Sequence, residues 1–370
     1  MRIALIHDWL TGMRGGERCL EVFCELFPQA HLYTLLHIPG SVSSSIEQMP
    51  IKTSFIQHLP FSKKAYRRYL PLFPMAIERF NLKEYDFILS CSHCVAKGII
   101  PSPDALHVSY MLTPMRYAWD MYSEYFGENK KMIIPFFIHY LRMWDVTSSY
   151  RVDHFLCISK HVEHRIQKFY RREAEIIHPP VEVSRFRLAN KKEDFFLIVS
   201  SFAPYKKIDS AIEAFNRLGY PIKIIGSGPA EKRLKSMAAS NVEFLGWQPD
   251  EVIADYYGKC RALIFPGEED FGIVPLEAMA CGNPVIAYGK GGALETIIAY
   301  NQRNKGKEDP TGIFFYEHRV DALIDAIQRF GDIEKEFDPK AIRSYVLQWD
   351  REIFKEKIKN AIFEKTGLRC

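Results

Sequence analysis

Residues 262–287 read ALIFPGEEDFGIVPLEAMACGNPVIA, and this stretch decides the fold class. It opens with an apolar run over 262–265 and ends with a second run over 285–287. Between them lies a segment that predicts a helix beginning near Pro275. Two short apolar runs joined through a helix are typical of neighbouring parallel strands. The stretch therefore predicts one βαβ unit of a parallel sheet that is covered by helices.

The same alternation extends in both directions along the 370 residues. The other predicted strands are 3–7, 31–35, 87–90, 108–111 and 155–158 in the first half, and 195–200, 222–225 and 242–245 in the second. Between them, Ser159 is predicted to cap a helix, and Gly219 to close the helix over 208–218. After Pro339 the pattern predicts helix almost to the end of the chain.

A break separates the two series of strands. The Pro179-Pro180 pair stops regular structure, and a polar, charged stretch over 190–194 follows it. We therefore predict an α/β protein of two doubly wound domains, residues 1–185 and 186–345, with a helical tail over 346–370 that packs back on them. Ligands of doubly wound sheets bind at the carboxyl ends of the strands, so we expect the site in a cleft there.

Composition excludes several classes of protein. The formal net charge is +4 and the sequence pI is about 8.5, which is too mild for a dedicated nucleic-acid binder, so no nucleic-acid partner is expected. The first ten residues lack the apolar core of a secretory signal, and no stretch is long and apolar enough to span a membrane. The expected location is the cytoplasm. The eight cysteines are too sparse for a disulfide scaffold, and the CxxC of Cys91 and Cys94 has no second pair for zinc.

The loop within the quoted stretch carries the strongest chemical signal. Glu269 and Glu277 flank an apolar segment that follows a predicted strand. Two carboxylates in that position accept hydrogen bonds from a polyhydroxyl ligand. The amides of Gly272, Ile273 and Val274, at the start of the predicted helix, would bind its phosphates. The alternative is a solvated acidic loop, which explains neither Phe271-Gly272 nor the apolar neighbours of Glu277.

Two glycine turns are weaker candidates for ligand contact. Gly12-Met13-Arg14-Gly15-Gly16-Glu17 follows the first predicted strand and opens a helix, where free amides attract anions. It has neither the dinucleotide-binding spacing nor the Walker A pattern. Gly226-Ser227-Gly228-Pro229 lies between a strand and a helix of the second domain. The alternative interpretation of both segments is a simple connecting turn.

The spacing Glu-x-Phe-Gly-x-x-x-x-Glu-Ala from Glu269 to Ala278, with Ala-Cys-Gly-x-Pro-Val after it, resembles retaining glycosyltransferase family 4 of the GT-B fold. Several other segments agree with this resemblance. They are Pro204 to Asp209, Gly226 to Pro229 and Gly291 to Thr296 in the second half, and Gly15 to Arg18 and Thr113 to Asp120 in the first, which resemble the branch of O-antigen mannosyltransferases. The likeness covers essentially the whole chain in the expected order.

This resemblance implies transfer of a hexose, with mannose from GDP-mannose expected, to a lipid-linked glycan with retention at the anomeric carbon. Lys206, helped by Lys207, would stabilise the leaving diphosphate, and Glu269 would hold the transferred sugar, so Lys206 and Glu269 are the predicted catalytic residues. Glu277 would accept hydrogen bonds from the ribose. The remaining predicted donor-binding residues are Gly15, Gly16, Gly226, Phe271, Gly272, Ile273 and Val274.

No cofactor is expected, because no Asp-x-Asp occurs that would supply the usual carboxylate pair for a metal-diphosphate site. Two positions depart from the family pattern. Ser201 stands where many members have arginine, and Leu112 where branch relatives often have histidine. His7 and His93 remain candidates nearby, or structural residues. Open alternatives are a UDP-sugar donor, a GT-B-like epimerase or phosphorylase, and a nucleotide-sugar-binding scaffold without activity.

Basic and apolar residues alternate in two segments of the first domain. Lys63, Lys64, Arg67 and Arg68 lie among the aromatic and aliphatic residues of 58–79, and Lys130-Lys131 precedes the apolar run over 132–137. This combination favours contact with an anionic membrane surface and with a lipid diphosphate acceptor, and Arg116 is a further expected acceptor contact. We therefore expect peripheral attachment to the cytoplasmic face of the membrane. The alternative is a solvated helix face in one segment and a buried core in the other.

Overall fold

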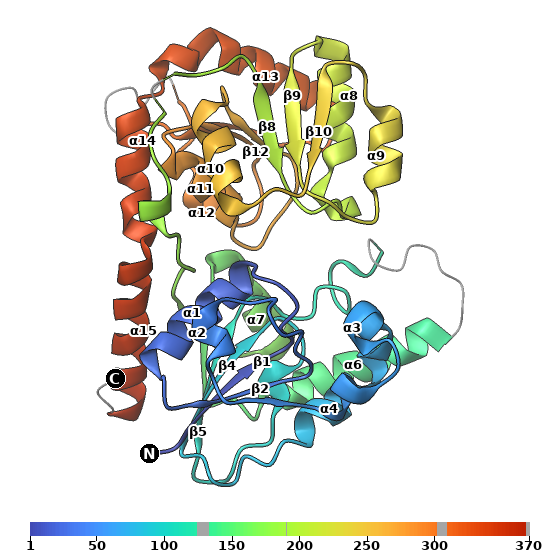
Figure 1. Cartoon of the computed structure of the whole chain (residues 1–370), viewed down its shortest axis with the longest axis vertical. Helices are drawn as coiled ribbons and strands as arrows, with labels where there is room; N and C mark the ends of the chain where they lie inside the picture. The colour runs from blue at the N-terminus through green and yellow to red at the C-terminus, as the bar shows by residue number, and fades with distance from the viewer. Residues whose placement is uncertain (124–132, 190, 302–308, 368–370) are drawn as a thin grey trace. The chain divides into compact units, whose positions relative to one another are not determined.

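The computed structural model describes residues 1–123, 133–189, 191–301 and 309–367 (Figure 1). The chain forms two compact units: unit 1 comprises residues 1–180 and 352–370, and unit 2 comprises residues 181–351. The predicted boundary, 185/186, falls slightly later. Lys130, Lys131 and Met132 of the second basic segment lie outside the described residues.

Unit 1 contains a parallel sheet of seven strands in the order β3-β2-β1-β4-β5-β6-β7. The strands are β1 (Ile3–His7), β2 (His31–Thr34), β3 (Ile51–Thr53), β4 (Phe87–Ser92), β5 (Leu106–Met111), β6 (His154–Cys157) and β7 (Glu175–Ile176). The helices of the unit are α1 (Gly15–Leu26), α2 (Ser44–Glu47), α3 (Ser62–Ala65), α4 (Phe73–Glu78), α6 (Ile133–Ser149), α7 (Lys160–Tyr170) and α15 (Arg351–Thr366). Ser159 caps α7 as predicted, with its hydroxyl accepting from Val162 N at 3.1 Å.

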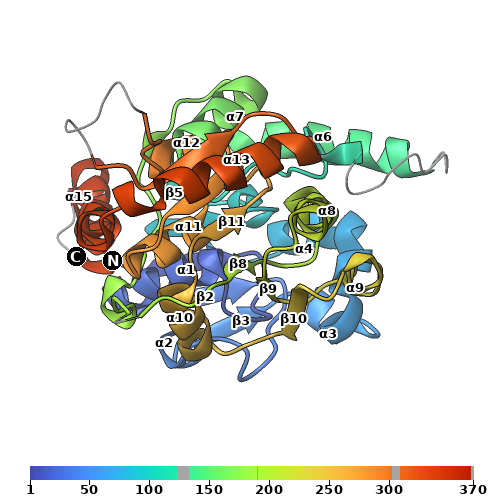
Figure 2. The same ribbon diagram turned by 90° about the horizontal axis from the view of Figure 1, so that it is seen from above.

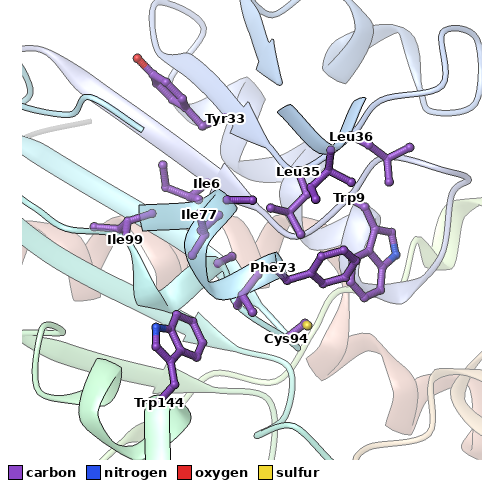
Figure 3. Packing of buried hydrophobic residues seen from close by; sticks show 14 of the residues in the cluster. Ile6, Trp9, Tyr33, Leu35, Leu36, Phe73, Ile77, Cys94, Ile99 and Trp144 are labelled. Carbon is purple, nitrogen blue, oxygen red and sulfur yellow. The ribbon is translucent and has the colours of Figure 1, made fainter. Parts of the chain in front are cut away.

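The core of unit 1 lies between the sheet and the helices that cover it. Figure 3 shows part of this core, in which the indole of Trp9 packs against Phe73 with ring centroids 6.0 Å apart. Helix α15 covers another part of the unit, because Phe354 stacks on Phe23 at 6.0 Å and meets the ring of Tyr110 at 5.7 Å. The last helix of the chain is thus part of unit 1.

Unit 2 contains a parallel sheet of six strands in the order β10-β9-β8-β11-β12-β13. The strands are β8 (Phe196–Val199), β9 (Ile222–Ile225), β10 (Val242–Gly246), β11 (Leu263–Phe265), β12 (Val285–Tyr288) and β13 (Gly312–Phe315). The helices are α8 (Ile208–Leu218), α9 (Glu231–Met237), α10 (Asp250–Lys259), α11 (Ile273–Ala280), α12 (Ala293–Thr296), α13 (Val320–Ile333) and α14 (Pro339–Val346). Helices α8 and α9 pack side by side next to β10 (Figures 1 and 2). Two doubly wound parallel sheets confirm the predicted fold class.

One prediction about helices is confirmed and one needs correction. The helix of the quoted stretch begins at Ile273, with Gly272 as its N-cap, two residues before Pro275. The continuous helix expected after Pro339 is interrupted at Asp350, whose backbone is extended with ψ 149°. The interruption arises because Val181 pairs there, donating to Trp349 O at 2.9 Å and accepting from Arg351 N at 3.1 Å.

Candidate active site

In each sheet the strand order reverses once, between β1 and β4 in unit 1 and between β8 and β11 in unit 2. The loops that leave the two central strands diverge at such a point, so the carboxyl ends of these strands are open to a ligand. In unit 2 these loops carry the two residues that the sequence predicts as catalytic. Lys206 ends the 3₁₀ turn over Pro204–Lys206 after β8, and Glu269 follows β11.

The ammonium of Lys206 contacts the carboxylate of Glu269 directly, Nζ to Oε1. Their side chains are 14% and 22% exposed, so the ion pair is partly buried yet reachable from solvent. The Lys206 Nζ also lies 5.3 Å from the centre of the Tyr205 ring. The structure thus brings together the predicted catalytic pair, which lie 63 residues apart in the sequence.

Backbone contacts fix the loops on both sides of this pair. A Cβ atom at Gly267 would lie 2.9 Å from Lys206 Cα, so the exit of β11 presses against the lysine turn. Gly291 has φ +68°, and a Cβ there would lie 2.4 Å from Glu269 O. Gly292 N also donates to Glu269 O at 2.8 Å. Both main chains are therefore held in place, and the freedom that remains belongs to the side chains.

Glu277 lies on α11, the helix that follows the Glu269 loop. Tyr257 from α10 donates its hydroxyl to Glu277 Oε2 at 3.0 Å. Burial and then the charge of Glu277 raise the pKa of Tyr257 well above its usual range, so this hydroxyl stays a hydrogen-bond donor at neutral pH. Tyr257 therefore orients the Glu277 carboxylate, a role that the sequence alone did not suggest.

The predicted donor-binding residues of unit 2 occupy several positions around this edge. Gly272 caps α11, and Ile273 and Val274 form its first turn. Phe271 is buried at 3% exposure. Gly226 follows β9, where its N–H donates to Gly246 O at 2.8 Å.

Other charged groups lie at the same edge as Lys206. Lys207 adopts a left-handed conformation with φ +53° and caps α8. Lys290 pairs with Glu268 at 3.1 Å, next to the Glu269 loop. Burial and then the charges of Lys207 and Lys290 lower the pKa of His318, which indicates that these cations share one region. This edge of unit 2 therefore gathers three lysines at the ends of its strands, two of which are paired with glutamates.

The reversal point of unit 1 holds a different group of residues. Asp8 is fully buried, and its carboxylate accepts from the backbone N–H groups of residues 93–96 at 2.6–3.0 Å. His93 Nδ1 lies 3.0 Å from Asp8 Oδ2, and its side chain is 29% exposed. Burial acts to raise the pKa of Asp8, but the charge and hydrogen bonds of His93 hold this pKa well below its usual range. Asp8 is therefore a fixed carboxylate beneath a partly exposed imidazole.

A second buried pair adjoins the first. His7 Nε2 lies 3.6 Å from Glu17 Oε1, and both side chains are at most 5% exposed. Burial lowers the pKa of His7, but the nearby charges of Glu17 and Asp8, with the backbone hydrogen bond to Cys91 O, outweigh it, so the net pKa is raised. Glu17 Oε2 also accepts from Arg14 N at 3.1 Å, which caps α1. Gly15 and Gly16 open this helix beside the buried pair.

Sequence reasoning did not assign the Asp8 and Glu17 carboxylates. His7 and His93 were weighed as candidates without a partner for either. The signal available was the position of Asp8 directly after a predicted strand, because neighbouring parallel strands bring their carboxyl ends together. Cys91 and Cys94 lie in the same region, and the seven described cysteines are all buried and form no disulfide with one another. Burial raises the pKa of both Cys91 and Cys94.

The predicted acceptor and membrane residues lie elsewhere in unit 1. The exposed cations Lys63 and Lys64 belong to α3, and Arg67 and Arg68 to the 3₁₀ turn over Tyr66–Leu72. Next to this turn, α4 and α6 border an apolar groove of about 390 Å³, whose exposed members include Met75, Phe136 and Met143. Arg116 is half-buried in the loop after β5.

Residues 181–343 match the family model described as glycosyl transferases group 1, and this segment contains Lys206, Glu269 and Glu277. The part of the chain that resembles this family is therefore unit 2, up to Arg343. It is 28% identical over 214 residues to an uncharacterized glycosyltransferase of Methanocaldococcus jannaschii, a match over 55% of this chain and 60% of that protein. It is 27% identical over 226 residues to the O-antigen chain mannosyltransferase RfbU of Salmonella typhimurium, over 57% of this chain and 63% of the relative. The matches thus span less than two thirds of either relative.

A solved structure shows the fold of the whole chain. HepE of Anabaena in complex with UDP superposes with a TM-score of 0.72 at 14% identity, over 98% of this chain and all of that one. The fold is therefore GT-B, as the resemblance implied. Within the described ranges, no set of three or more His, Cys, Asp or Glu side chains is arranged to hold a metal ion. No helix of the described residues is both long and apolar enough to cross a bilayer.

Proposed function

We propose that this protein transfers a hexose, mannose from GDP-mannose, to a lipid-linked glycan with retention of the anomeric configuration. The contact between Lys206 and Glu269 at the open end of β8 and β11 carries this proposal. It joins a cation suited to a leaving phosphate with a carboxylate suited to sugar hydroxyls. Similarity to O-antigen chain mannosyltransferases supports mannose as the sugar.

The chemistry asks the protein to stabilise negative charge on the departing nucleoside diphosphate. Lys206 would meet that charge, and Lys207 would add to it. The amides at the start of α11 would contribute fixed dipoles. Glu277, oriented by Tyr257, would accept hydrogen bonds from the ribose hydroxyls. The bond from the anomeric carbon to the phosphate oxygen breaks, a bond to the acceptor oxygen forms on the same face, and the phosphate oxygen takes the acceptor's proton.

Acceptor-dependent release of nucleotide tests this proposal. Incubation with GDP-mannose and a lipid-linked glycan should release GDP and give a product that keeps the donor's anomeric configuration by NMR. Equal GDP release without the glycan would contradict transfer and favour the epimerase alternative. We also propose that transfer needs no metal. Activity that disappears with EDTA and returns only with Mn²⁺ or Mg²⁺ would contradict this part.

The donor's base is tested separately, because UDP is the nucleotide bound to the similar HepE structure. A nucleotide at 100 times its dissociation constant should stabilise the folded protein by about 2.7 kcal/mol, which a thermal-shift panel detects. We expect GDP to raise the melting temperature more than UDP. A shift with UDP alone would replace GDP-mannose by a UDP-sugar.

We further propose that unit 1 binds the lipid acceptor and an anionic membrane surface through Lys63, Lys64, Arg67 and Arg68. The 3₁₀ segment that carries Arg67 and Arg68 continues into Pro71 and Leu72, which line the apolar groove of α4 and α6. Each basic residue near an anionic bilayer contributes about 1 kcal/mol. Replacing all four by glutamine should reduce sedimentation with anionic liposomes and raise the acceptor KM, with donor affinity unchanged.

A matched control replaces four other exposed lysines, Lys232, Lys335, Lys340 and Lys357, by glutamine. The control has the same net charge as the test variant. Equal loss of liposome binding in both would mean that net charge alone is responsible, and no change in the test variant would refute the membrane-facing role.

A further inference from the structure

The ammonium of Lys206 has one partner in the structure and would have another in a complex with the donor. In the structure it is held by the carboxylate of Glu269. The proposed donor needs the same ammonium for its diphosphate. We infer that Glu269 competes with the diphosphate for Lys206, and so sets how tightly the site holds a nucleoside diphosphate. This inference rests on the proposed function and assigns Glu269 a second role beyond holding the sugar.

Competition requires that the two side chains separate while their loops stay in place. The main chain at Gly267 lies against that of Lys206, and Glu269 O accepts a hydrogen bond from Gly292 N, so the main chain of each loop is tied to a neighbouring segment. Both side chains retain some exposure, 14% for Lys206 and 22% for Glu269. A phosphate oxygen that reaches Lys206 therefore replaces a carboxylate oxygen by side-chain rotation alone.

The charges at this edge make the exchange costly for the diphosphate until Glu269 turns away. A carboxylate in contact with Lys206 neutralises the cation and repels an incoming anion at close range. Partial burial strengthens both effects relative to a fully exposed pair. Once displaced, Glu269 is free to meet the sugar hydroxyls, and after transfer it returns to Lys206 and favours departure of the nucleoside diphosphate.

The neighbouring ion pair supplies a matched control. Glu268 precedes Glu269 in the same loop and pairs with Lys290 at 3.1 Å, a lysine that is 59% exposed. Glu268→Gln and Glu269→Gln remove the same charge from adjacent positions. Any effect of net charge on nucleotide binding is therefore shared by the two variants, and only Glu269→Gln frees Lys206.

The test is calorimetric titration of GDP and of UDP into the full-length wild-type protein and the two glutamine variants. We expect Glu269→Gln to bind the preferred nucleotide about three- to tenfold more tightly, and Glu268→Gln to change the dissociation constant by less than about twofold. In a Lys206→Met background, Glu269→Gln should tighten binding no more than Glu268→Gln does, because only the shared loss of negative charge remains when Lys206 is absent. Glu269→Ala serves as a second variant if the glutamine protein fails to fold.

The outcomes separate the inference from the proposed function. Unchanged or weaker binding in Glu269→Gln and Glu269→Ala, with normal binding by the wild type, overturns the competition alone. Equal tightening in Glu268→Gln overturns it too, since net charge then explains the effect. If the wild type binds neither GDP nor UDP, the proposed function fails, and the inference that rests on it fails with it.

Discussion

The two units share a strand order, but they differ in the burial of the charged residues at the point where that order reverses. In unit 1, Asp8 is fully buried and holds the backbone of residues 93–96, and the His7–Glu17 pair is at most 5% exposed. In unit 2, Lys206 and Glu269 are 14% and 22% exposed. The first group is built into the fold, whereas the second is accessible to an exchanging ligand.

In the same architecture, the buried charges of unit 1 stabilise the fold, whereas the accessible charges of unit 2 are available to a ligand. Burial makes a charge costly unless it is fully hydrogen-bonded, so the Asp8 carboxylate with its four backbone donors acts as a structural anchor. A pair near the surface contributes little to stability and is free to change partners. We therefore expect substitutions in unit 1 to act mainly on folding, and those in unit 2 mainly on nucleotide binding and turnover.

The largest expected effect is on the stability of unit 1. Asp8→Asn should lower the free energy of unfolding by about 3–5 kcal/mol, because it leaves His93 and the backbone donors without their buried carboxylate. The measurement is urea denaturation followed by circular dichroism. Asp86→Asn is the matched control. Asp86 is exposed, and among the described backbone groups only Arg2 N donates to its carboxylate, at 2.8 Å. Similar loss in both variants would erase the contrast between the units.

Lys206→Ala should act on turnover instead. Loss of an electrostatic contact to charge that develops in the transition state typically lowers the rate about 100-fold or more, so we expect that fall in kcat with little change in unfolding free energy. Lys207→Ala is the control at the next position. Near-normal kcat in Lys206→Ala, with a strong fall in Lys207→Ala, would move the phosphate contact to Lys207.

Much of the fold was predictable because its strands are short apolar runs. The strands 3–7 and 222–225 were predicted with their observed bounds, since each is enclosed by polar or turn-forming residues. Strands β3, β7 and β13 were missed. Two of them have only two or three residues and lie at a sheet edge, where little burial is needed and so no apolar run appears. The break at Asp350 depends on pairing with the distant Val181, which no local pattern carries.

The candidate site was predictable only in part. Motif spacing selected Glu269 and Lys206, and their contact follows from strand order that the sequence does not reveal. The position of Asp8 directly after a predicted strand was the only signal, and it did not show the role of Asp8, because its partners are backbone groups about 85 residues further along the chain. Tyr257 was missed for the same reason, since its role depends on the packing of α10 against α11. Long-range contacts, and not residue types, decide these roles.

A smaller effect is expected for Glu277, the proposed ribose contact of unit 2. Glu277→Ala should raise the donor KM about tenfold with kcat nearly unchanged, because ribose contacts are equal in ground and transition states. Tyr257→Phe should raise KM less, since it removes only the group that orients Glu277. The measurement is steady-state kinetics with donor varied. A fall in kcat larger than the change in KM would place Glu277 near the reacting carbon and not at the ribose.

The smallest expected effect is a pH dependence that belongs to unit 1. The folded pKa of His7 is raised above its unfolded value of about 6.5, so the folded state binds the extra proton more tightly. The stabilisation is complete below about pH 6.5 and declines as the pH rises through the folded pKa.

Glu17→Gln removes the group that raises this pKa. Urea denaturation of both proteins from pH 5.5 to 8.5 should show the wild type losing more stability than Glu17→Gln as pH rises, by about 1.4 kcal/mol per unit of pKa difference. Subtracting the two curves cancels His107, whose pKa burial lowers to about 4 in both proteins. Parallel curves would mean that Glu17 does not raise the pKa of His7. The buried charged group of unit 1 would then contribute to stability through Asp8 alone.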